Sequence, residues 1–429
     1  MAVRLIETVL RDGKPLARSS TARPSAGSGE ALSSRDRAFA RLIALTVLRR
    51  RGSLQKLLDR FLQRPLPEAA ARATAILLAG AAQILFIKTP AHAAINLAVE
   101  QCRRDRQAHR FAGLTNAVLR RVSSEGPPLL PGLDAASLDV PGWLMDRWRN
   151  RYGQETARAI ALASLEEPPL DLSVKSDAAG WAERLGGALL PTGSVRLTDA
   201  GRIEDLPGYA GGAWWVQDAA AALPIRLLGA VTGKDVADLC AAPGGKSAAL
   251  AAAGARVTAV DVSPERLKLV RENLDRLDLA ASTEIIAADI ETWEPHRTFD
   301  RVLLDAPCSA TGTIRRHPDI LHLKQKDELT RLVGLQGRLL ARAARLTKPG
   351  GLLIYCTCSL EPEECEDQVR EFLAAHPEFS RVPILPGESA IEPAWVTRDG
   401  DLRTLPCHAP GSAAGGMDGF FAARLRRRE

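Results

Sequence analysis

The chain has 429 residues, 46% of them hydrophobic and 25% charged, which excludes a disordered or fibrous protein. This length allows about three domains of roughly 150 residues each. The net charge is +6, but residues 1–60 alone carry 13 Lys and Arg against five Asp and Glu. A basic excess confined to one segment favours contact with a polyanion, with a solvated basic tail as the alternative.

The seven cysteines are spread through the chain without regular spacing, which argues against a secreted disulfide framework and favours a reducing compartment. Charged residues at positions 4, 7, 11 and 12 interrupt any apolar segment of the kind found in a signal peptide. The longest uncharged apolar stretch, 73–87, is shorter than the roughly 20 residues that a membrane span needs. We therefore expect a cytoplasmic protein without a membrane partner, in which 73–87 is a buried core helix. For the oligomeric state we assume a monomer.

Residues 12–34 are rich in Ser, Gly, Pro and Arg, and we expect a disordered basic leader over residues 1–33. In residues 34–125, apolar side chains such as Phe39, Leu42 and Val47 recur at helical spacing, which predicts an all-helical bundle. Arginines near its first and last helices predict contacts with RNA phosphates, and a structural bundle with a charged face is the alternative. These arginines are Arg35, Arg37, Arg49, Arg50, Arg120 and Arg121.

Two stretches of the bundle carry a resemblance to a known domain. They are Ile-Leu-Phe-Ile-Lys-Thr-Pro-Ala-His-Ala-Ala-Ile-Asn-Leu-Ala-Val-Glu (84–100) and Phe-Ala-Gly-Leu-Thr-Asn-Ala-Val-Leu-Arg-Arg-Val (111–122). Both resemble the NusB domain of antitermination factors. The resemblance implies that the bundle binds RNA.

The middle of the chain predicts a connection followed by a small domain. Residues 126–164 begin with several prolines and continue with aromatic residues, which predicts a linker with short helices. Residues 165–232 alternate short strand and helix patterns, which predicts a small α+β subdomain. Trp214 and Trp215 at its end are expected in its core, although base stacking is a second reading.

Residues 233–429 alternate apolar strands with helical stretches. This alternation predicts an α/β fold with a doubly wound, mostly parallel sheet whose site lies at the carboxyl ends of the strands. The expected strands are 235–240, 256–260, 284–287, 299–305, 351–356 and 419–425.

The first two of these strands flank a glycine turn, Cys240-Ala241-Ala242-Pro243-Gly244-Gly245-Lys246, and the second strand ends on Asp261. Glycines allow backbone N–H groups to approach a ligand, and an acid at the end of the next strand accepts hydrogen bonds from a ribose diol. The pattern predicts a nucleoside-cofactor site. Its spacing does not match a phosphate-binding P-loop, and two glycines that merely end a strand are the alternative.

Two later strands each end beside a cysteine. Cys308 lies in Asp-Ala-Pro-Cys-Ser (305–309), and Cys358 lies in Thr-Cys-Ser (357–359). Asp289 closes the strand between them and the glycine turn. Two thiols at one crevice with a nucleoside-cofactor loop indicate S-adenosyl-L-methionine and a covalent nucleophile. A zinc site is the weaker alternative, because the cysteines lack a C-x-x-C pair.

Five motifs together resemble the bacterial RNA cytosine-5 methyltransferases of the RsmB (Sun/Fmu) type, which carry a NusB-like domain ahead of the catalytic domain. They are the stretches 240–246, 305–309, Arg-Arg-His-Pro-Asp (315–319), 357–359 and Asp-Gly-Phe-Phe (418–421). The resemblance implies small-subunit rRNA as substrate and residues 240–246, Asp261, Asp289 and Asp305 as cofactor ligands. It also implies Cys358 as the nucleophile and Cys308 in later steps, namely product release or proton handling.

The chemistry needs such a set, because C5 of cytosine becomes nucleophilic only after a thiolate has added at C6. We expect Asp305 to hold the base, Lys246 to donate a hydrogen bond in the same crevice, and a helix that starts after Ser359 to favour the thiolate of Cys358. Arg315 and Arg316 are expected to contact phosphates of an unstacked target.

Three alternatives remain open. In DNA cytosine methyltransferases the cysteine after proline is the nucleophile, which here is Cys308. A DNA methyltransferase and a non-catalytic RNA-binding factor are the other two.

Overall fold

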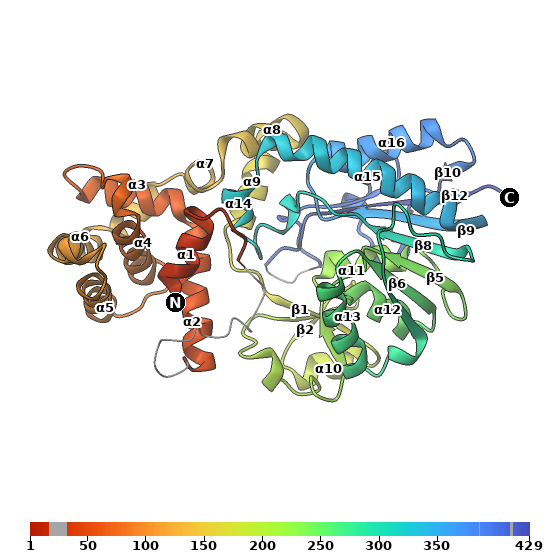
Figure 1. Cartoon of the computed structure of the whole chain (residues 1–429), viewed down its shortest axis with the longest axis horizontal. Helices are drawn as coiled ribbons and strands as arrows, with labels where there is room; N and C mark the ends of the chain where they lie inside the picture. Colours follow the sequence, from red (N-terminus) through yellow and green to blue (C-terminus); the bar gives the residue numbers. More distant parts are fainter. Residues whose placement is uncertain (17–31, 386, 412–414) are drawn as a thin grey trace. The chain divides into compact units, whose positions relative to one another are not determined.

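In the computed structural model, residues 1–16, 32–385, 387–411 and 415–429 are described. The chain forms two compact units (Figure 1). The first contains Met1–Leu165 and Arg316–Lys324, and the second contains Glu166–Arg315 and Gln325–Glu429. The predicted linker with short helices, 126–164, therefore belongs to the first unit.

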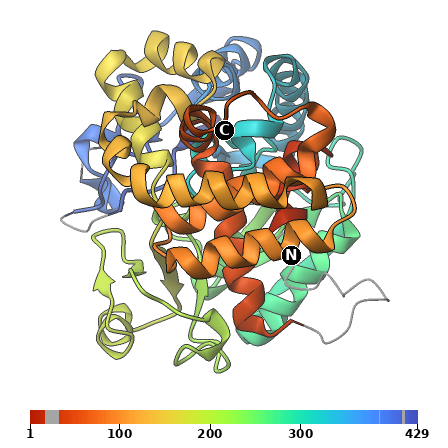
Figure 2. The same ribbon diagram turned by 90° about the vertical axis from the view of Figure 1, so that its left-hand side faces the viewer.

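The first unit is a helical bundle in which α4, α5 and α6 pack side by side (Figure 2). Helix α4 is its central element, and the side chains of Ile76, Leu77 and Leu78 are buried, as predicted for 73–87. By length and composition alone, the segment Glu68–Leu85 could cross a membrane, but 67% of it is buried inside the bundle. The helices are α1 (Ala2–Leu10), α2 (Ser34–Arg49), α3 (Arg51–Phe61), η1 (Glu68–Ala70), α4 (Ala71–Leu85), α5 (Ala91–Arg104), η2 (His109–Phe111), α6 (Ala112–Glu125), η3 (Pro127–Gly132), α7 (Ala135–Asp139), α8 (Gly142–Tyr152) and α9 (Gln154–Ser164).

The prediction of a disordered leader over residues 1–33 is wrong for residues 1–16. Helix α1 buries Val3, Ile6 and Val9, which recur at helical spacing on one face, and it packs against α2 and α4. Its Glu7 forms an ion pair with Arg72 of α4 at 2.6 Å. Of the charged residues in this segment, Arg4 is exposed on the helix, Glu7 is buried in an ion pair, and Arg11 and Asp12 follow the end of the helix. Residues 17–31 of the predicted leader lie outside the described residues.

A short segment of the C-terminal half belongs to the first unit. After Arg315 the chain enters it, forms α14 (Ile320–Leu323), and leaves again at Gln325. Leu323 packs against Val9 and Leu48, and Asp319 accepts a hydrogen bond from the Leu16 backbone N–H at 3.1 Å. The bundle is thus completed by the Arg-Arg-His-Pro-Asp motif, which sequence patterns alone did not predict.

The second unit begins with a small antiparallel sheet of strand order β2-β3-β1-β4. Trp214 and Trp215 are buried there, so their assignment to the core is confirmed and base stacking by them is excluded. Beneath the sheet, Arg196 and Asp171 form a buried bidentate ion pair with both N···O distances at 2.7 Å. The elements are β1 (Leu170–Val174), α10 (Ala178–Arg184), β2 (Ala188–Leu189), β3 (Val195–Leu197), η4 (Ile203–Asp205) and β4 (Trp214–Val216).

The large sheet of the second unit has the order β10-β12-β9-β8-β5-β6-β7, and β11 pairs with β12. Five neighbouring strands, in the order β9-β8-β5-β6-β7, are parallel to one another, and β12 is antiparallel to β9. Helices α15 and α16 cover one face, and α11, α12 and α13 cover the other (Figure 1). This is the predicted doubly wound fold. Its strands are β5 (Asp235–Leu239), β6 (Arg256–Asp261), β7 (Thr283–Ala287), β8 (Phe299–Asp305), β9 (Thr347–Thr357), β10 (Phe379–Arg381), β11 (Leu402–Thr404) and β12 (Phe420–Arg427).

The two faces of the large sheet build two cores. Adjacent residues of a strand point to opposite faces, so Leu303 packs with the α11 and α12 side and Leu304 packs with the α15 and α16 side. Both layers fix the parallel strands in register, and the strands therefore end together at one edge. The helices are α11 (Ala219–Arg226), α12 (Gly245–Ala252), α13 (Pro264–Arg276), η5 (Ala280–Ser282), η6 (Thr311–Thr313), α15 (Lys326–Leu346), η7 (Pro362–Glu364), α16 (Glu366–Ala375), η8 (Glu388–Ala390) and η9 (Pro393–Trp395).

Candidate active site

The glycine turn connects β5 to α12 at the carboxyl edge of the large sheet. Gly244 has φ +100°, and a Cβ at this position would lie 3.1 Å from the Cα of Val270, so both conformation and space require glycine. The Ala242 N–H donates to Asp261 Oδ2 at 3.1 Å, which ties the turn to the end of β6. The turn therefore has a defined conformation that is fixed by its neighbours, and its glycines do more than end a strand.

Three acids follow the ends of neighbouring strands at this edge, as predicted. Asp261 is buried and accepts a second hydrogen bond from the Ser263 N–H at 3.0 Å. Asp289, which follows β7, is exposed, and Asp305 at the end of β8 has 29% of its side chain exposed. The structure thus brings the predicted acids to one edge and shows that Asp261 also supports the turn.

Val262 is a residue that sequence reasoning missed. It follows Asp261 directly, and its apolar side chain is 66% exposed, which is unusual beside a buried strand. An exposed aliphatic surface next to strand-terminal carboxylates fits a nucleoside, whose base needs an apolar contact and whose ribose needs acceptors. The residues present therefore fit S-adenosyl-L-methionine. The sequence signal was an aliphatic residue placed just after the acid that closes β6.

Lys246 donates to Asp305 Oδ2 at 2.7 Å, as expected of a hydrogen-bond donor in this crevice. Its Nζ lies 5.2 Å from the ring centroid of Phe420, in the Asp-Gly-Phe-Phe motif. Burial is the largest single influence and lowers the pKa of Lys246, but the charge and hydrogen bond of Asp305, together with the charges of Cys356 and Asp238, outweigh it and raise the pKa. The crevice therefore holds a permanent cation paired with an acid.

The two predicted thiols meet at the same edge. The Sγ atoms of Cys308 and Cys358 are 3.5 Å apart, and both side chains are partly exposed. The hydrogen bond to Cys358, with burial and the charges of Cys358 and Glu364, raises the pKa of Cys308 well above its ordinary value. The two sulfur atoms therefore lie within hydrogen-bond distance, and either thiol can be the donor.

The other cysteines of this region are structural. Cys356 and Cys365 are fully buried, and burial raises the pKa of the Cys365 thiol to about 12. Within the described ranges, no three His, Cys, Asp or Glu side chains are grouped so that they could hold a metal ion. The structure therefore gives the zinc alternative no support.

The predicted helix start after Ser359 is wrong. Helix α16 begins only at Glu366, and a loop with the short η7 turn follows Cys358. This loop is held by the segment after Cys308, because the Gly312 N–H donates to the Cys358 carbonyl at 2.9 Å. The Pro-Glu-Glu stretch, acidic and starting with proline, is typical of a helix start but folds here as a 3₁₀ turn.

Arg315 is not an RNA contact, which corrects the prediction. Its side chain is buried and forms ion pairs with Asp218 at 2.8 Å and Asp418 at 3.1 Å. It thereby joins the start of α11 to the Asp-Gly-Phe-Phe motif. Arg316, the next residue, is partly exposed and belongs to the first unit.

The arginines predicted as RNA contacts in the bundle likewise include both buried and exposed residues. Arg49 is buried, so its prediction as a phosphate contact is wrong. Arg50 stacks on the Phe86 ring at 5.5 Å, and Arg37 donates to the Leu32 carbonyl. The remaining three, Arg35, Arg120 and Arg121, are exposed.

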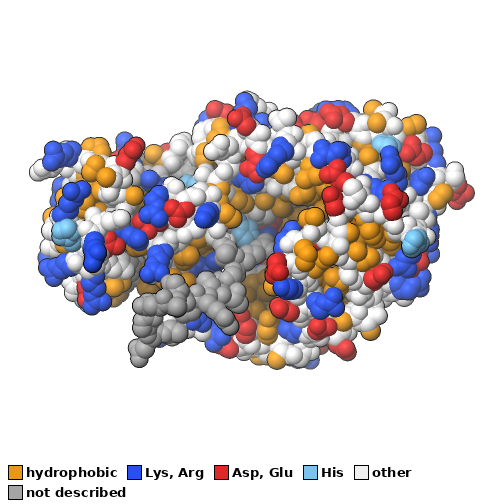
Figure 3. Space-filling model, in the orientation of Figure 1, with side chains coloured by type: hydrophobic (Ala, Val, Ile, Leu, Met, Phe, Trp, Pro, Cys, Tyr) orange, Lys and Arg blue, Asp and Glu red, His pale blue; other side chains and the backbone are white. Residues whose placement is uncertain are grey.

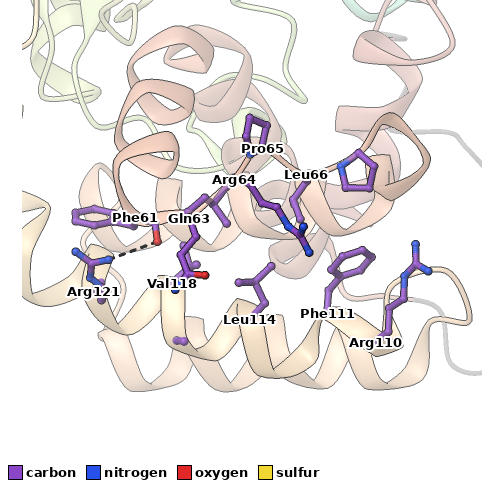
Figure 4. Close-up of a pocket in the computed structure, with 13 residues that line it drawn as sticks. Phe61, Gln63, Arg64, Pro65, Leu66, Arg110, Phe111, Leu114, Val118 and Arg121 are labelled. Atoms are coloured by element: carbon purple, nitrogen blue, oxygen red, sulfur yellow. Dashed lines mark hydrogen bonds between the residues drawn. The ribbon is translucent and has the colours of Figure 1, made fainter.

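Arg121 also lines a groove of about 830 Å³ between α6 and the segment 61–67 (Figure 4). Leu66, Leu114 and Val118 contribute apolar surface, and Arg64 and Arg110 join Arg121 around it. Figure 3 shows further Lys and Arg side chains scattered over the face of the bundle that it draws. Residues 1–124 carry 22 Lys and Arg against eight Asp and Glu, a net charge of +14.

Comparison with known proteins gives matches to two families. Residues 225–426 match the family of 16S rRNA methyltransferase RsmB/F, and residues 1–124 match the NusB family. The chain is 38% identical over 404 residues to ribosomal RNA small subunit methyltransferase B of Xylella fastidiosa strain Temecula1, covering 91% of this chain and 90% of that protein.

Two solved structures share the fold. The crystal structure of PH0851 aligns with a TM-score of 0.73 at 24% identity and covers 93% of this chain and 92% of the other. A methyltransferase homolog from Pyrococcus horikoshii aligns with a TM-score of 0.57 at 28% identity, over 70% of this chain and 99% of the other.

Proposed function

The chain belongs to the RsmB/F family of 16S rRNA methyltransferases and is an S-adenosylmethionine-dependent rRNA methyltransferase; on this premise we propose that it methylates C5 of a cytosine in small-subunit rRNA through a covalent adduct of Cys358. One observation carries the proposal. Two thiols lie 3.5 Å apart at the sheet edge that also holds the cofactor turn. A methyltransferase that acts on a nucleophilic nitrogen or oxygen has no need of such a pair.

The steps follow from the chemistry of the cytosine ring. The Cys358 thiolate adds at C6, and the electron density that this addition moves to C5 makes that carbon a nucleophile. S-adenosyl-L-methionine supplies the methyl group that C5 then takes. A water molecule takes the C5 proton, and the electron pair of the broken C5–H bond re-forms the C5–C6 double bond and expels the sulfur from C6. This step releases the product and returns Cys358 as the thiolate. The S–H of Cys308 stabilises this thiolate before attack and after release.

Asp305 and Lys246 are proposed to place the base. Asp305 is partly exposed at the end of β8, and its carboxylate can accept a hydrogen bond from the amino group of cytosine. Lys246 fixes the orientation of that carboxylate through its 2.7 Å bond. Charge that develops on the ring during addition at C6 then faces a preorganised cation–acid pair.

The proposed reaction predicts 5-methylcytidine as the product. We expect the protein, small-subunit rRNA and S-adenosyl-L-methionine labelled in the methyl group to give labelled 5-methylcytidine after digestion to nucleosides and mass spectrometry. A DNA of the same sequence is the control and is expected to gain no label. Label on another atom of the nucleoside, or equal label on the DNA, would contradict the proposal.

We also propose that the helical bundle holds the rRNA, with its basic groove as one contact. The +14 charge of residues 1–124 supports this, because phosphate contacts dominate the affinity of proteins for nucleic acids. Arg64 is exposed at the groove, and Arg110 lies 4.8 Å from the Phe111 ring centroid, where its guanidinium plane is set to stack on a base.

The double variant Arg64→Ala/Arg110→Ala is expected to weaken rRNA binding. Loss of each phosphate contact lowers the slope of log K against log salt concentration by about 1, so the slope should fall by up to about 2. The rate at saturating RNA should stay within about twofold, because the groove takes no part in the chemistry. Filter binding at several salt concentrations measures the slope. Arg202→Ala, an exposed arginine of the second unit, is the matched control; an unchanged slope in the double variant would refute the groove contact.

A further inference from the structure

Glu364 is a fully buried acid that touches both cysteine loops. Its Oε1 accepts hydrogen bonds from the Ser309 backbone N–H at 2.8 Å and from Gln336 Nε2 at 2.9 Å. Its Oε2 accepts the hydroxyl groups of Ser309 and Ser359. All four of these donors are neutral groups, and together they satisfy both oxygens of the buried carboxyl group.

Two of the donors to Glu364 lie next to the two thiols in the sequence. Ser309 directly follows Cys308, and Ser359 directly follows Cys358. The two hydroxyl groups are also 3.0 Å from each other. One carboxylate is therefore the common anchor of the two residues that follow the two thiols, although the loops come from different strands.

Glu364 also holds the residue before Cys308, through Gln336. Gln336 of α15 donates to Glu364 and also to the Pro307 carbonyl at 2.9 Å, so the residue before Cys308 is held through the same carboxylate. The Tyr355 hydroxyl donates to the Glu364 carbonyl at 2.7 Å and fixes the η7 turn against β9. Glu364 itself is thus held rigidly by the sheet, as a positioning group must be.

We propose that Glu364 is a positioning residue that sets the distance and orientation between the thiols of Cys308 and Cys358. Its effect on methyl transfer rests on the proposed covalent mechanism, whereas its effect on the spacing of the thiols does not. Without this anchor the residues that follow the two thiols lose their common hydrogen-bond partner, and the distance between the sulfur atoms of Cys308 and Cys358 is no longer fixed. Misplacement of a reacting group by about 1 Å costs on the order of 10²-fold in rate.

The test uses the full chain and the variant Glu364→Gln, in which an amide that presents an NH₂ group replaces one of the two acceptor oxygens. We expect kcat to fall about 10²-fold while KM for S-adenosyl-L-methionine changes less than about threefold, because the cofactor turn does not contact Glu364. A kcat within about threefold of the wild type overturns the inference. So does a loss of kcat that follows only a loss of cofactor binding.

A second readout reports the spacing of the thiols without any catalysis. Phenylarsine oxide condenses with two neighbouring thiols, forming two arsenic–sulfur bonds and releasing one water. We expect its affinity for the pair to fall at least tenfold in Glu364→Gln and to be lost in Cys308→Ser. An unchanged affinity in Glu364→Gln overturns the inference.

Asp401→Asn is the matched control, since Asp401 is also a buried acid of the second unit but pairs with Arg381. It is expected to leave the arsenical affinity unchanged, and an equal loss there would show a general loosening and overturn the inference. If Glu364→Gln does not fold, Ser359→Ala removes one arm of the anchor and is expected to cost about tenfold in kcat; no loss there overturns the inference. A wild-type chain that forms no 5-methylcytidine yet shows the arsenical effect refutes the proposed function and leaves the anchor standing.

Discussion

Cys358→Ala is expected to abolish methyl transfer, with a loss on the order of 10⁴-fold or more, as for the removal of a covalent nucleophile. Without the thiolate, C5 of cytosine has no activated form, and correct placement of the cofactor does not compensate. Single-turnover methylation of small-subunit rRNA measures the rate. Binding of S-adenosyl-L-methionine, measured by calorimetry, is expected to stay within about threefold because the thiol lies outside the cofactor turn.

Comparing Cys308→Ala with Cys358→Ala distinguishes the roles of the two thiols in an adduct-trapping experiment. RNA that carries 5-fluorocytosine traps the adduct, because fluorine at C5 cannot leave as the proton does. We expect Cys308→Ala to form this adduct and Cys358→Ala to form none. An adduct that survives in Cys358→Ala and is absent in Cys308→Ala would make Cys308 the nucleophile, as in the DNA enzymes. The 3.5 Å sulfur–sulfur distance alone does not decide between the two thiols, so this pair of variants is decisive.

The site at the carboxyl edge of the sheet was predictable from the sequence, because each of its parts lies at the end of a strand that the local sequence marks. Apolar strands that end just before the glycine turn, at Asp261, at Asp305 and just before Cys358 show where the chain turns, and the parallel topology brings such strand ends to one edge. The meeting of Cys308 and Cys358 follows from β8 and β9 being neighbours in the sheet. Their hydrogen bond depends on loop conformation, which strand patterns do not contain.

The errors about burial share one physical cause, which is that charge does not determine exposure. Helix α1 carries charged residues, yet its apolar face completes the bundle core. Arg315 and Arg316 are identical in type and adjacent, but one is buried against two acids and the other is partly exposed. Glu364 was hidden for the same reason, because a glutamate in an acidic stretch gives no sign that four neutral donors surround it.

The Arg315 cluster predicts the largest effect on stability. Arg315→Met keeps the length of the side chain but removes the charge that Asp218 and Asp418 share. Breaking a buried ion pair by removing one partner costs about 3–5 kcal/mol, because the buried acids lose the cation that pairs with them. Urea unfolding of the second unit is expected to show this loss as a lower midpoint with an unchanged m value.

The adjacent arginine provides the control for the Arg315 variant. Arg316→Met is expected to cost less than about 1 kcal/mol, as for a charged residue that is partly exposed. Adding Asp218→Asn and Asp418→Asn to Arg315→Met should recover much of the lost stability, since the charges left by the arginine are then gone. If Arg315→Met costs no more than Arg316→Met, the buried cluster contributes nothing to folding. Recovery of stability in the triple variant would show that Arg315 compensates the negative charge of the two acids. These acids join the start of α11 to the Asp-Gly-Phe-Phe motif, whose Phe420 contacts Lys246 of the active site.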